Sequence, residues 1–431
     1  MYRSVHTGLF IQLYGALCFD IEIDKSNLAE PCARQVLHMA SSMQILTHRI
    51  TLLVTHGCNL DCAYCYERHK SRRMMTCDVA LRVVSQEFVM ATRAGCKVFH
   101  VTFMGGEPFL NFDVIKSVVE WMQKQNTNVR MEAYATTNGT VLTEEMKDWL
   151  VAHRDIFKVQ LSYDGTPIQQ EANRTSRTID INFFLTTFPM QGVHVTISKQ
   201  TLPQLSEGVR YILDKGARCS TTLAIGTEWA DQDAIIYFRE LRDLVDAYLT
   251  RYTDREPIPA LNGSLHLIGS HNVGKPSCRE CIDFRTYDVD GTAYPCHLFT
   301  PLVVGKERSI SLDYFEKDDR LMQCGGKDDP CCSDCPLCNW CPTCYGFNYL
   351  FTGSTGARNN HACKMMFAQA LAASEYQICY FNTVGVTETT ASKAKAAIHA
   401  YRILRRRNVT NNLQRVYGNT CCPTDVKNLN Q

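Results

Sequence analysis

The stretch RITLLVTHGCNLDCAYCYE, residues 49–67, decides the fold of this chain. Its first half is an apolar run rich in leucine and β-branched residues, which predicts a buried strand. Its second half is a short loop that carries Cys58, Cys62 and Cys65. A loop with three thiols directly after a buried strand indicates chemistry at the carboxyl end of a barrel strand.

Five more apolar runs follow, each with a helical stretch behind it. Strands are predicted at 98–103, 130–135, 157–162, 193–198 and 219–225. Helices are predicted at 77–94, 111–125, 143–153, 178–189, 203–215 and 231–251. Six successive β-α units predict an α/β fold with a parallel sheet. Because a complete barrel has eight units, we expect a partial (β/α)6 barrel, with a doubly wound sheet as the competing architecture.

The pattern divides the chain into four parts: 1–45 as an N-terminal extension, 46–252 as the barrel, 253–365 as a cysteine-rich domain, and 366–431 as C-terminal helices and a tail. The length of 431 residues suits two or three units at roughly 100–200 residues per domain. An irregular stretch as long as 253–365 is unusual unless metal clusters replace a hydrophobic core.

Charge and composition exclude several classes of protein. The chain has 45 basic and 44 acidic residues, so no nucleic-acid footprint is expected. No apolar run approaches the ~20 residues of a membrane span, and no clear signal-peptide cleavage site is present. Of the 22 cysteines, eleven lie between Cys278 and Cys363. Clustered thiols in a large chain predict metal ligation in a reducing, cytoplasmic compartment rather than disulfides.

The three thiolates of the first loop suit an iron–sulfur cluster. They can bind three irons of a 4Fe–4S cubane, which leaves the fourth iron open for a small molecule. The alternative is a structural zinc site, which normally takes four protein ligands. His56, His69 or Cys77 would then have to supply the fourth.

CNLDCAYC, residues 58–65, resembles the CxxxCxxC signature of the radical S-adenosylmethionine (SAM) superfamily. In that superfamily the open iron binds SAM, and reduction cleaves SAM to a 5′-deoxyadenosyl radical. The resemblance implies that Tyr64, before the third cysteine, packs near the adenine; a core tyrosine is the alternative. It also implies that GGEP in FMGGEPFL (103–110) holds the amino group of SAM, with Gly105, Gly106 and Glu107 as contacts. Alone, this segment would be an ordinary turn.

The resemblance extends to polar residues at the ends of later strands. It implies SAM or substrate contacts for Asn138, Ser162, Asp164 and Ser198. Each is also a plausible helix cap or turn residue. Arg174 resembles an arginine that follows the SxDG segment in the family, and a solvated surface arginine is the alternative.

The cysteine-rich stretch resembles the SPASM extension of radical SAM enzymes, which holds two auxiliary 4Fe–4S clusters. Its motifs are CIDFRTYDVDGTAYPC (281–296) and CCSDCPLCNWCPTC (331–344). A register that starts at Cys335 loses a ligand at Asn348, so we prefer the register that starts at Cys332. The implied ligands are Cys278, Cys281, Cys296 and Cys344 for one cluster and Cys332, Cys335, Cys341 and Cys363 for the other.

Three cysteines of this stretch are then left over: Cys324, Cys331 and Cys338. Cys338 could displace a neighbour, because the spacing is degenerate. One or two zinc sites are the alternative to the auxiliary clusters. The cofactors expected in total are three 4Fe–4S clusters and SAM.

Radical SAM enzymes with this extension chiefly modify peptides and proteins. The resemblance implies a peptide maturase that forms a thioether or another crosslink, with a precursor peptide or protein as substrate and a flavodoxin- or ferredoxin-type reductant. Sulfatase-maturing members carry an Asp after the YPC cysteine, where this chain has His297, so sulfatase-type oxidation is the second expectation. His297 is a candidate base, a hydrogen-bond donor to a cluster sulfur, or a packing histidine. A non-catalytic iron–sulfur or zinc scaffold is the expectation from another class.

Overall fold

The computed structural model describes residues 47–176, 179–270, 284–318, 321, 332, 334–342, 344–358 and 360–405. The chain divides into two units after residue 46, and all described residues belong to the second unit. The N-terminal extension, the tail and four cysteines of the cysteine-rich stretch lie outside the described residues: Cys278, Cys281, Cys324 and Cys331. The domain boundaries expected from the sequence stay predictions.

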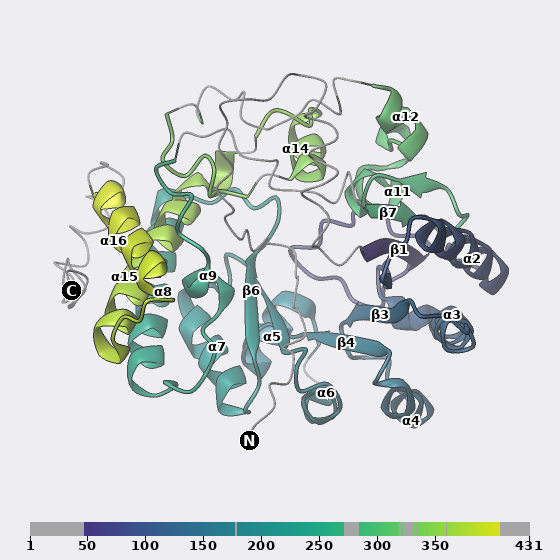
Figure 1. The fold of residues 1–431 in the computed structure, drawn as a ribbon, viewed down its shortest axis with the longest axis horizontal. Helices are drawn as coiled ribbons and strands as arrows, with labels where there is room; N and C mark the ends of the chain where they lie inside the picture. Colours follow the sequence, from purple (N-terminus) through teal and green to yellow (C-terminus); the bar gives the residue numbers. More distant parts are fainter. Residues whose placement is uncertain are drawn as a thin grey trace. The chain divides into compact units, whose positions relative to one another are not determined.

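Among the described residues, eight strands form one sheet in the order β6-β5-β4-β3-β2-β1-β7-β8 (Figure 1). The six predicted strands are all present and parallel: β1 (Thr47–Thr55), β2 (Val98–Gly105), β3 (Arg130–Thr137), β4 (Phe157–Ser162), β5 (Val193–Ile197) and β6 (Cys219–Leu223). A doubly wound sheet reverses its strand order at a switch point. These six strands keep their chain order, so the partial barrel is confirmed.

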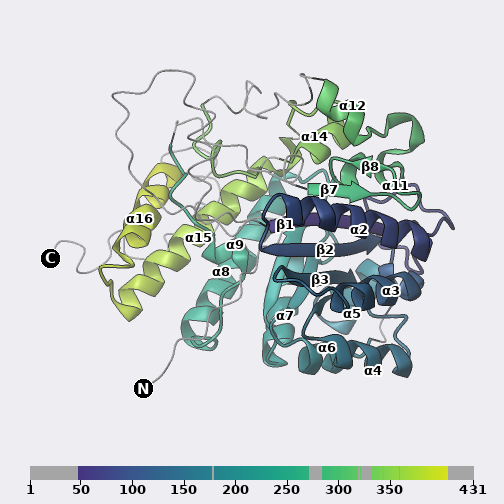
Figure 2. The same cartoon turned by 45° about the vertical axis from the view of Figure 1, so that its right-hand side comes forward.

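Helices lie along the outside of the curved sheet, and Figure 2 shows α2 and α3 beside β1, β2 and β3. The six predicted helices are α2 (Cys77–Arg93), α3 (Phe112–Gln123), α4 (Glu144–His153), α6 (Ile181–Thr187), α7 (Leu205–Asp214) and α8 (Asp231–Thr250). Short 3-10 turns precede α3 and α7: η1 (Pro108–Asn111) and η2 (Leu202–Gln204). Thr76 begins α2, because its side chain accepts a hydrogen bond from the amide of Val79 at 3.3 Å.

One barrel helix, α5 (Pro167–Arg174), escaped prediction. Its local start signals are clear, since Thr166 forms a capping box with Gln169 and a proline occupies the first turn. It has no apolar stripe, however, and the residues it buries are all polar: Gln169, Gln170, Asn173 and Arg174. A search for hydrophobic periodicity therefore cannot find it.

The sheet is buried on both faces near its centre. Ile50, Leu52, Leu53 and Val54 of β1 are all fully buried, so the strand reads as a continuous apolar run rather than an alternation. Burial of each such side chain contributes about 1.5–3 kcal/mol relative to exposure. This apolar layer fixes the positions at which the strands end and their loops begin.

The cysteine-rich stretch contains more regular structure than expected. A four-residue strand, β7 (Phe284–Tyr287), extends the barrel sheet in parallel beside β1, and β8 (Ala293–Tyr294) pairs with it antiparallel. The other short elements are α9 (Pro259–Asn262), η3 (His297–Phe299), α11 (Pro301–Val304), η4 (Lys306–Arg308), α12 (Leu312–Lys317), α14 (Tyr345–Thr352) and η5 (Asn360–Ala362). Elements this short show no readable period in the sequence.

A buried carboxylate attaches β7 to the barrel. Glu87 of α2 is almost fully buried and accepts hydrogen bonds from Tyr287 and from Arg285, the latter at 3.1 Å. His48 of β1 lies 2.5 Å from the same carboxylate. Burial would raise the pKa of Glu87, but the hydrogen bonds from His48 and Tyr287 outweigh it and hold the pKa below its usual value. Glu87 is therefore a charged group that joins α2, β1 and β7.

Two helices predicted near the C-terminus are present as α15 (Cys363–Val384) and α16 (Ala391–Arg405). α15 packs against α8, α9 and α16, which lie together in Figure 1. None of the described helices combines the length and the apolar character needed to cross a membrane.

We predict that Glu87→Ala lowers the free energy of unfolding by about 3 kcal/mol, because it leaves three polar partners without their shared acceptor. Thermal or denaturant unfolding followed by circular dichroism measures this. Glu144→Ala is the control, since Glu144 is exposed and its ion pair with Lys147 lies on the surface. Equal stability of the two variants would contradict the role given to Glu87.

Candidate functional site

The three cysteines of the first motif lie on the loop that leaves β1, here called the cluster loop (residues 56–73). All three thiols are half-buried. The loop folds tightly, since the amide of Cys65 donates to the carbonyl of Cys62 at 3.1 Å and the amide of Leu60 contacts the sulfur of Cys58 at 3.4 Å. The motif therefore gathers three thiols on one short turn at the carboxyl end of the first barrel strand.

The thiols of the cluster loop suit a metal that binds them as thiolates and displaces their protons. Burial raises the pKa of Cys58, and it raises the pKa of Cys62 to about 11, so both are neutral thiols near pH 7 when no metal is bound. In the part of the chain that the structure describes, no three Cys, His, Asp or Glu side chains already stand in metal-binding geometry. Because these thiols carry protons before a metal binds, cluster binding would release protons.

The turn after β2 lies directly against the cluster loop. A Cβ atom at Gly106 would lie 2.2 Å from the carbonyl oxygen of Gly57 and 2.9 Å from the Cβ of Cys58. Gly105 has a φ of +142°, and a Cβ there would lie 2.1 Å from the carbonyl of Thr55. Only glycine permits this approach. The two motifs that are far apart in the sequence thus form one backbone contact.

Glu107 is buried and its carboxylate is already bound by the chain. It accepts hydrogen bonds from the amide of Phe109 at 3.0 Å, the hydroxyl of Thr137 at 2.7 Å and the amide of Asn138 at 2.8 Å. Burial raises the pKa of Glu107, and these three hydrogen bonds counter part of the rise. The carboxylate thus joins the ends of β2 and β3 and keeps little capacity to accept from a ligand.

Asn138, after β3, contacts the cluster loop. Its side-chain amide donates to Asn59 at 3.0 Å, and Asn59 in turn donates to the hydroxyl of Thr140 at 2.7 Å. Asn59 stands next to Cys58 in the chain. The end of β3 therefore supports the segment that carries the first thiol.

Asp164 is the centre of a buried polar network. Its carboxylate accepts hydrogen bonds from Tyr64 at 2.5 Å, Arg174 at 2.9 Å, Asn173 at 3.1 Å and the amide of Thr196 at 2.8 Å. Arg174 is buried, which excludes the surface arginine considered for it, and its guanidinium lies 5.4 Å from the ring centre of Tyr64. Burial raises the pKa of Tyr64 well above its usual value, so the phenol keeps its proton and donates.

Ser198 and Tyr64 line a cavity of about 210 Å³ beside the cluster loop. The hydroxyl of Ser198 donates to Asn173 at 2.6 Å. Ser162, at the end of β4, is buried and does not line this cavity. The remaining walls come from the cluster loop and from the ends of β5 and β6: Ala63, Arg68, Lys199, Gln200, Ile225, Gly226 and Thr227. No sequence pattern marks Arg68, Lys199 or Gln200, because each is an ordinary polar residue in a loop.

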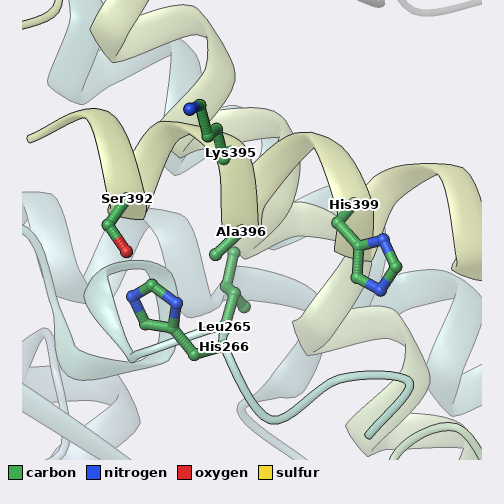
Figure 3. A pocket seen from close by; sticks show the side chains of 6 residues that line it. All are labelled: Leu265, His266, Ser392, Lys395, Ala396 and His399. Atoms are coloured by element: carbon green, nitrogen blue, oxygen red, sulfur yellow. The ribbon is translucent and has the colours of Figure 1, made fainter. Parts of the chain in front are cut away.

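A larger hollow of about 460 Å³ lies between residues 265–266 and α16. Figure 3 shows its polar side chains, and His266, Lys395 and His399 do not point toward a common centre. None of its lining residues comes from the end of a barrel strand. The smaller cavity beside the cluster loop is therefore the candidate active site.

Six of the eight cysteines assigned to auxiliary clusters lie within the described residues: Cys296, Cys332, Cys335, Cys341, Cys344 and Cys363. Cys296 is buried before η3, Cys344 precedes α14, and Cys363 begins α15. Burial, together with the nearby thiols of Cys363, Cys335 and Cys332, raises the pKa of Cys341 to about 12. The four cysteines assigned to the second auxiliary cluster are therefore near one another: Cys332, Cys335, Cys341 and Cys363.

His297 lies beside the cluster loop. Its Nε2 atom is 3.3 Å from the hydroxyl of Tyr66, and the two rings are 5.9 Å apart. Phe347 of α14 packs edge-on against Tyr66 at 6.2 Å. His297 therefore contacts the residue that follows Cys65, a relation between distant segments that the sequence could not reveal.

Comparison with known proteins finds an iron–sulfur domain in the first part of the chain. The family model described as "4Fe-4S single cluster domain" matches residues 47–180. The radical SAM cyclopropyl synthase TigE of Paramaledivibacter caminithermalis is 25% identical over 129 residues, 27% of each chain. An uncharacterised protein of Methanocaldococcus jannaschii is 27% identical over 177 residues, 39% of this chain. The chain spans 59% of the length of that relative.

Solved structures share the fold at low identity. The structure of anSMEcpe with bound AdoMet and a Cp18Cys peptide has a TM-score of 0.60 at 19% identity, over 79% of this chain and 100% of that one. SuiB of Streptococcus suis bound to its precursor peptide SuiA has a TM-score of 0.50 at 17% identity, over 80% and 83% of the two chains.

We predict that Cys62→Ala lowers the iron content of anaerobically reconstituted protein by about four irons per chain, because one cubane loses a ligand. Cys77→Ala is the matched control: that thiol begins α2 and accepts a hydrogen bond from Ser117 at 3.3 Å, so its loss should leave iron unchanged. Equal losses from both variants, or bound zinc in place of iron, would contradict the three-thiolate site.

We also predict that Gly106→Ala loses the same irons, because its methyl group would push the cluster loop away from β2. Gly263→Ala is the control, since its Cβ would meet only the carbonyl of Pro259 at 3.4 Å. Iron and sulfide analysis of both variants provides the measurement. A full iron complement in Gly106→Ala would show that the contact is dispensable.

Proposed function

We propose that this chain reductively cleaves SAM and uses the resulting 5′-deoxyadenosyl radical to modify a peptide. Its cysteine motifs resemble those of radical SAM enzymes with a SPASM extension, and it shares its fold with a solved structure that holds AdoMet. The observation that carries this proposal is the contact between the three-cysteine loop and the Gly105–Gly106 turn. A cluster with an open iron supplies the radical chemistry when SAM is bound; the protein supplies binding, orientation and exclusion of water.

The residues of this chain have separate roles in the proposal. Cys58, Cys62 and Cys65 hold the cluster. Tyr64 and Ser198 face the cavity in which SAM would lie, beside the cationic side chains of Arg68 and Lys199. Both cations are exposed, and they would attract the carboxylate of SAM or of a peptide through a charge attraction that salt screens.

Other residues expected to contact SAM are given a supporting role. Glu107 and Asp164 are carboxylates whose hydrogen bonds are made within the protein, and Asn138 supports the cluster loop through Asn59. We infer that they fix the ends of the strands around the cavity and leave direct contact with SAM to backbone groups of the Gly105–Gly106 turn. Rigid support of this kind is what an active site needs to hold reactants in register.

A peptide substrate is the favoured class because two structural neighbours were crystallised with peptides, a Cp18Cys peptide for anSMEcpe and the precursor SuiA for SuiB. Thioether or other crosslink formation is our first proposal, and oxidation of the sulfatase-maturing type is the second. We propose three 4Fe–4S clusters, two of them in the cysteine-rich stretch, and a flavodoxin- or ferredoxin-type reductant as the electron source.

We predict that the reconstituted chain, reduced with dithionite under anaerobic conditions, converts SAM to 5′-deoxyadenosine and methionine in the absence of any peptide. Chromatography of the products measures both. Cys62→Ala should form neither product, because the open iron is lost with its cluster. A protein with its full iron complement that leaves SAM intact would identify a non-catalytic scaffold instead.

A further inference from the structure

Both ends of the cluster loop are bound by one carboxylate. The loop begins at His56 and ends at Arg73, and the amide of His56 donates to the carbonyl of Arg73 at 3.0 Å. Asp288 lies 2.5 Å from Nε2 of His56 through one oxygen and 3.5 Å from the guanidinium of Arg73 through the other. A single side chain therefore joins His56 and Arg73, the two ends of the loop, here called its neck, in addition to the backbone hydrogen bond between them.

The contact between Asp288 and His56 is buried, so removal of the Asp288 carboxylate should destabilise the loop. Asp288 is 1% exposed and His56 is 3% exposed, so their contact is shielded from water. Ser71 lies 3.4 Å from the other ring nitrogen of His56, which orients the imidazole toward Asp288. A buried polar group that loses its partner is destabilised far more than an exposed one.

Asp288 comes from the cysteine-rich stretch, not from the barrel. It follows β7 directly and lies between Cys281 and Cys296, both proposed as auxiliary-cluster ligands. The segment that it begins, residues 288–305, is here called the clamp segment.

Besides Asp288 and Asp290, which lie near Arg73, the clamp segment contacts the cluster loop at Tyr66 and at His69. Tyr66 contacts His297 at 3.3 Å, and the amide of His69 donates to the carbonyl of Leu302 at 3.0 Å. At the end of the segment, a Cβ atom at Gly305 would lie 3.1 Å from the ring of His69. The loop is thus held at its neck and along its outer side by the same short segment.

We propose that Asp288 is a positioning residue, which acts through His56 and Arg73 to hold the neck of the cluster loop and so keeps the three thiols placed for a SAM-binding cluster. This role rests on the proposed function. The cysteine-rich stretch would then have a second role besides cluster binding, because the segment that leads to Cys296 also holds the cluster loop.

The test compares Asp288→Ala with Asp290→Ala in the full-length, reconstituted protein. Asp290 is a matched control: it lies two residues away and pairs with Arg73 at 2.8 Å, but it is half exposed and does not touch His56. Amide hydrogen exchange of residues 56–73, read by mass spectrometry, reports on the neck. The electron paramagnetic resonance (EPR) spectrum of the reduced protein with and without SAM reports on the cluster.

In Asp288→Ala, exchange across residues 56–73 should be at least about tenfold faster than in the parent chain, and the spectral change on SAM addition should be lost or altered. Asp290→Ala should match the parent chain in both measurements. Exchange and spectra of Asp288→Ala that equal those of Asp290→Ala would overturn the proposal.

Two outcomes separate this inference from the proposed function. If Asp288→Ala does not fold, Asp288→Asn is the second variant, because it keeps the shape of the side chain and one acceptor oxygen. Amide exchange across residues 56–73 in Asp288→Asn should be faster than in the parent chain and slower than in a loop whose amides are unprotected. If the parent chain holds its irons but never cleaves SAM, the proposed function fails, while the exchange comparison still decides whether Asp288 holds the neck.

Discussion

The cluster loop can present three thiols at the end of β1 only because the backbone of the next strand's turn touches it. Gly106 leaves no room for a side chain against Gly57, and Glu107 then fixes that turn to the end of β3. The buried apolar run of β1 sets where the loop starts, and these contacts set where its thiols lie. The packing of the barrel thus determines where the cofactor site lies.

Around this contact, polar networks replace apolar packing at the ends of the strands. Asp164 accepts hydrogen bonds from Tyr64 of the cluster loop, from Arg174 of α5 and from the amide of Thr196 in β5, and thereby joins these three elements. Buried polar groups that have hydrogen-bond partners make such a network rigid, and Arg174 and Asn173 are bonded in this way, whereas Nε2 of Gln170 is buried without a partner. This explains why α5 buries polar residues: they support the site and leave the core to the other helices.

The sequence was sufficient for the barrel because β1 and β4 are buried in nearly continuous runs and β2, β3 and β5 alternate in burial. Helices with an apolar stripe follow these strands. It failed for α5, whose buried face is polar, and for β7, whose four residues show no period. Motif spacing located the three thiols and the glycine turn. It could not locate the contact between His56 and Asp288, which lie 232 positions apart in the chain. Contacts of that kind depend on the fold and leave no local signal.

The central claim is that a cubane on Cys58, Cys62 and Cys65 keeps one iron free for SAM. Electron–nuclear double resonance tests it most directly, with SAM that carries an isotopic label on its amino nitrogen and protein reduced by one electron. The account predicts a strong coupling between the label and the cluster spin, which is lost in Cys62→Ala. A fully loaded wild-type protein that shows no such coupling would contradict the account.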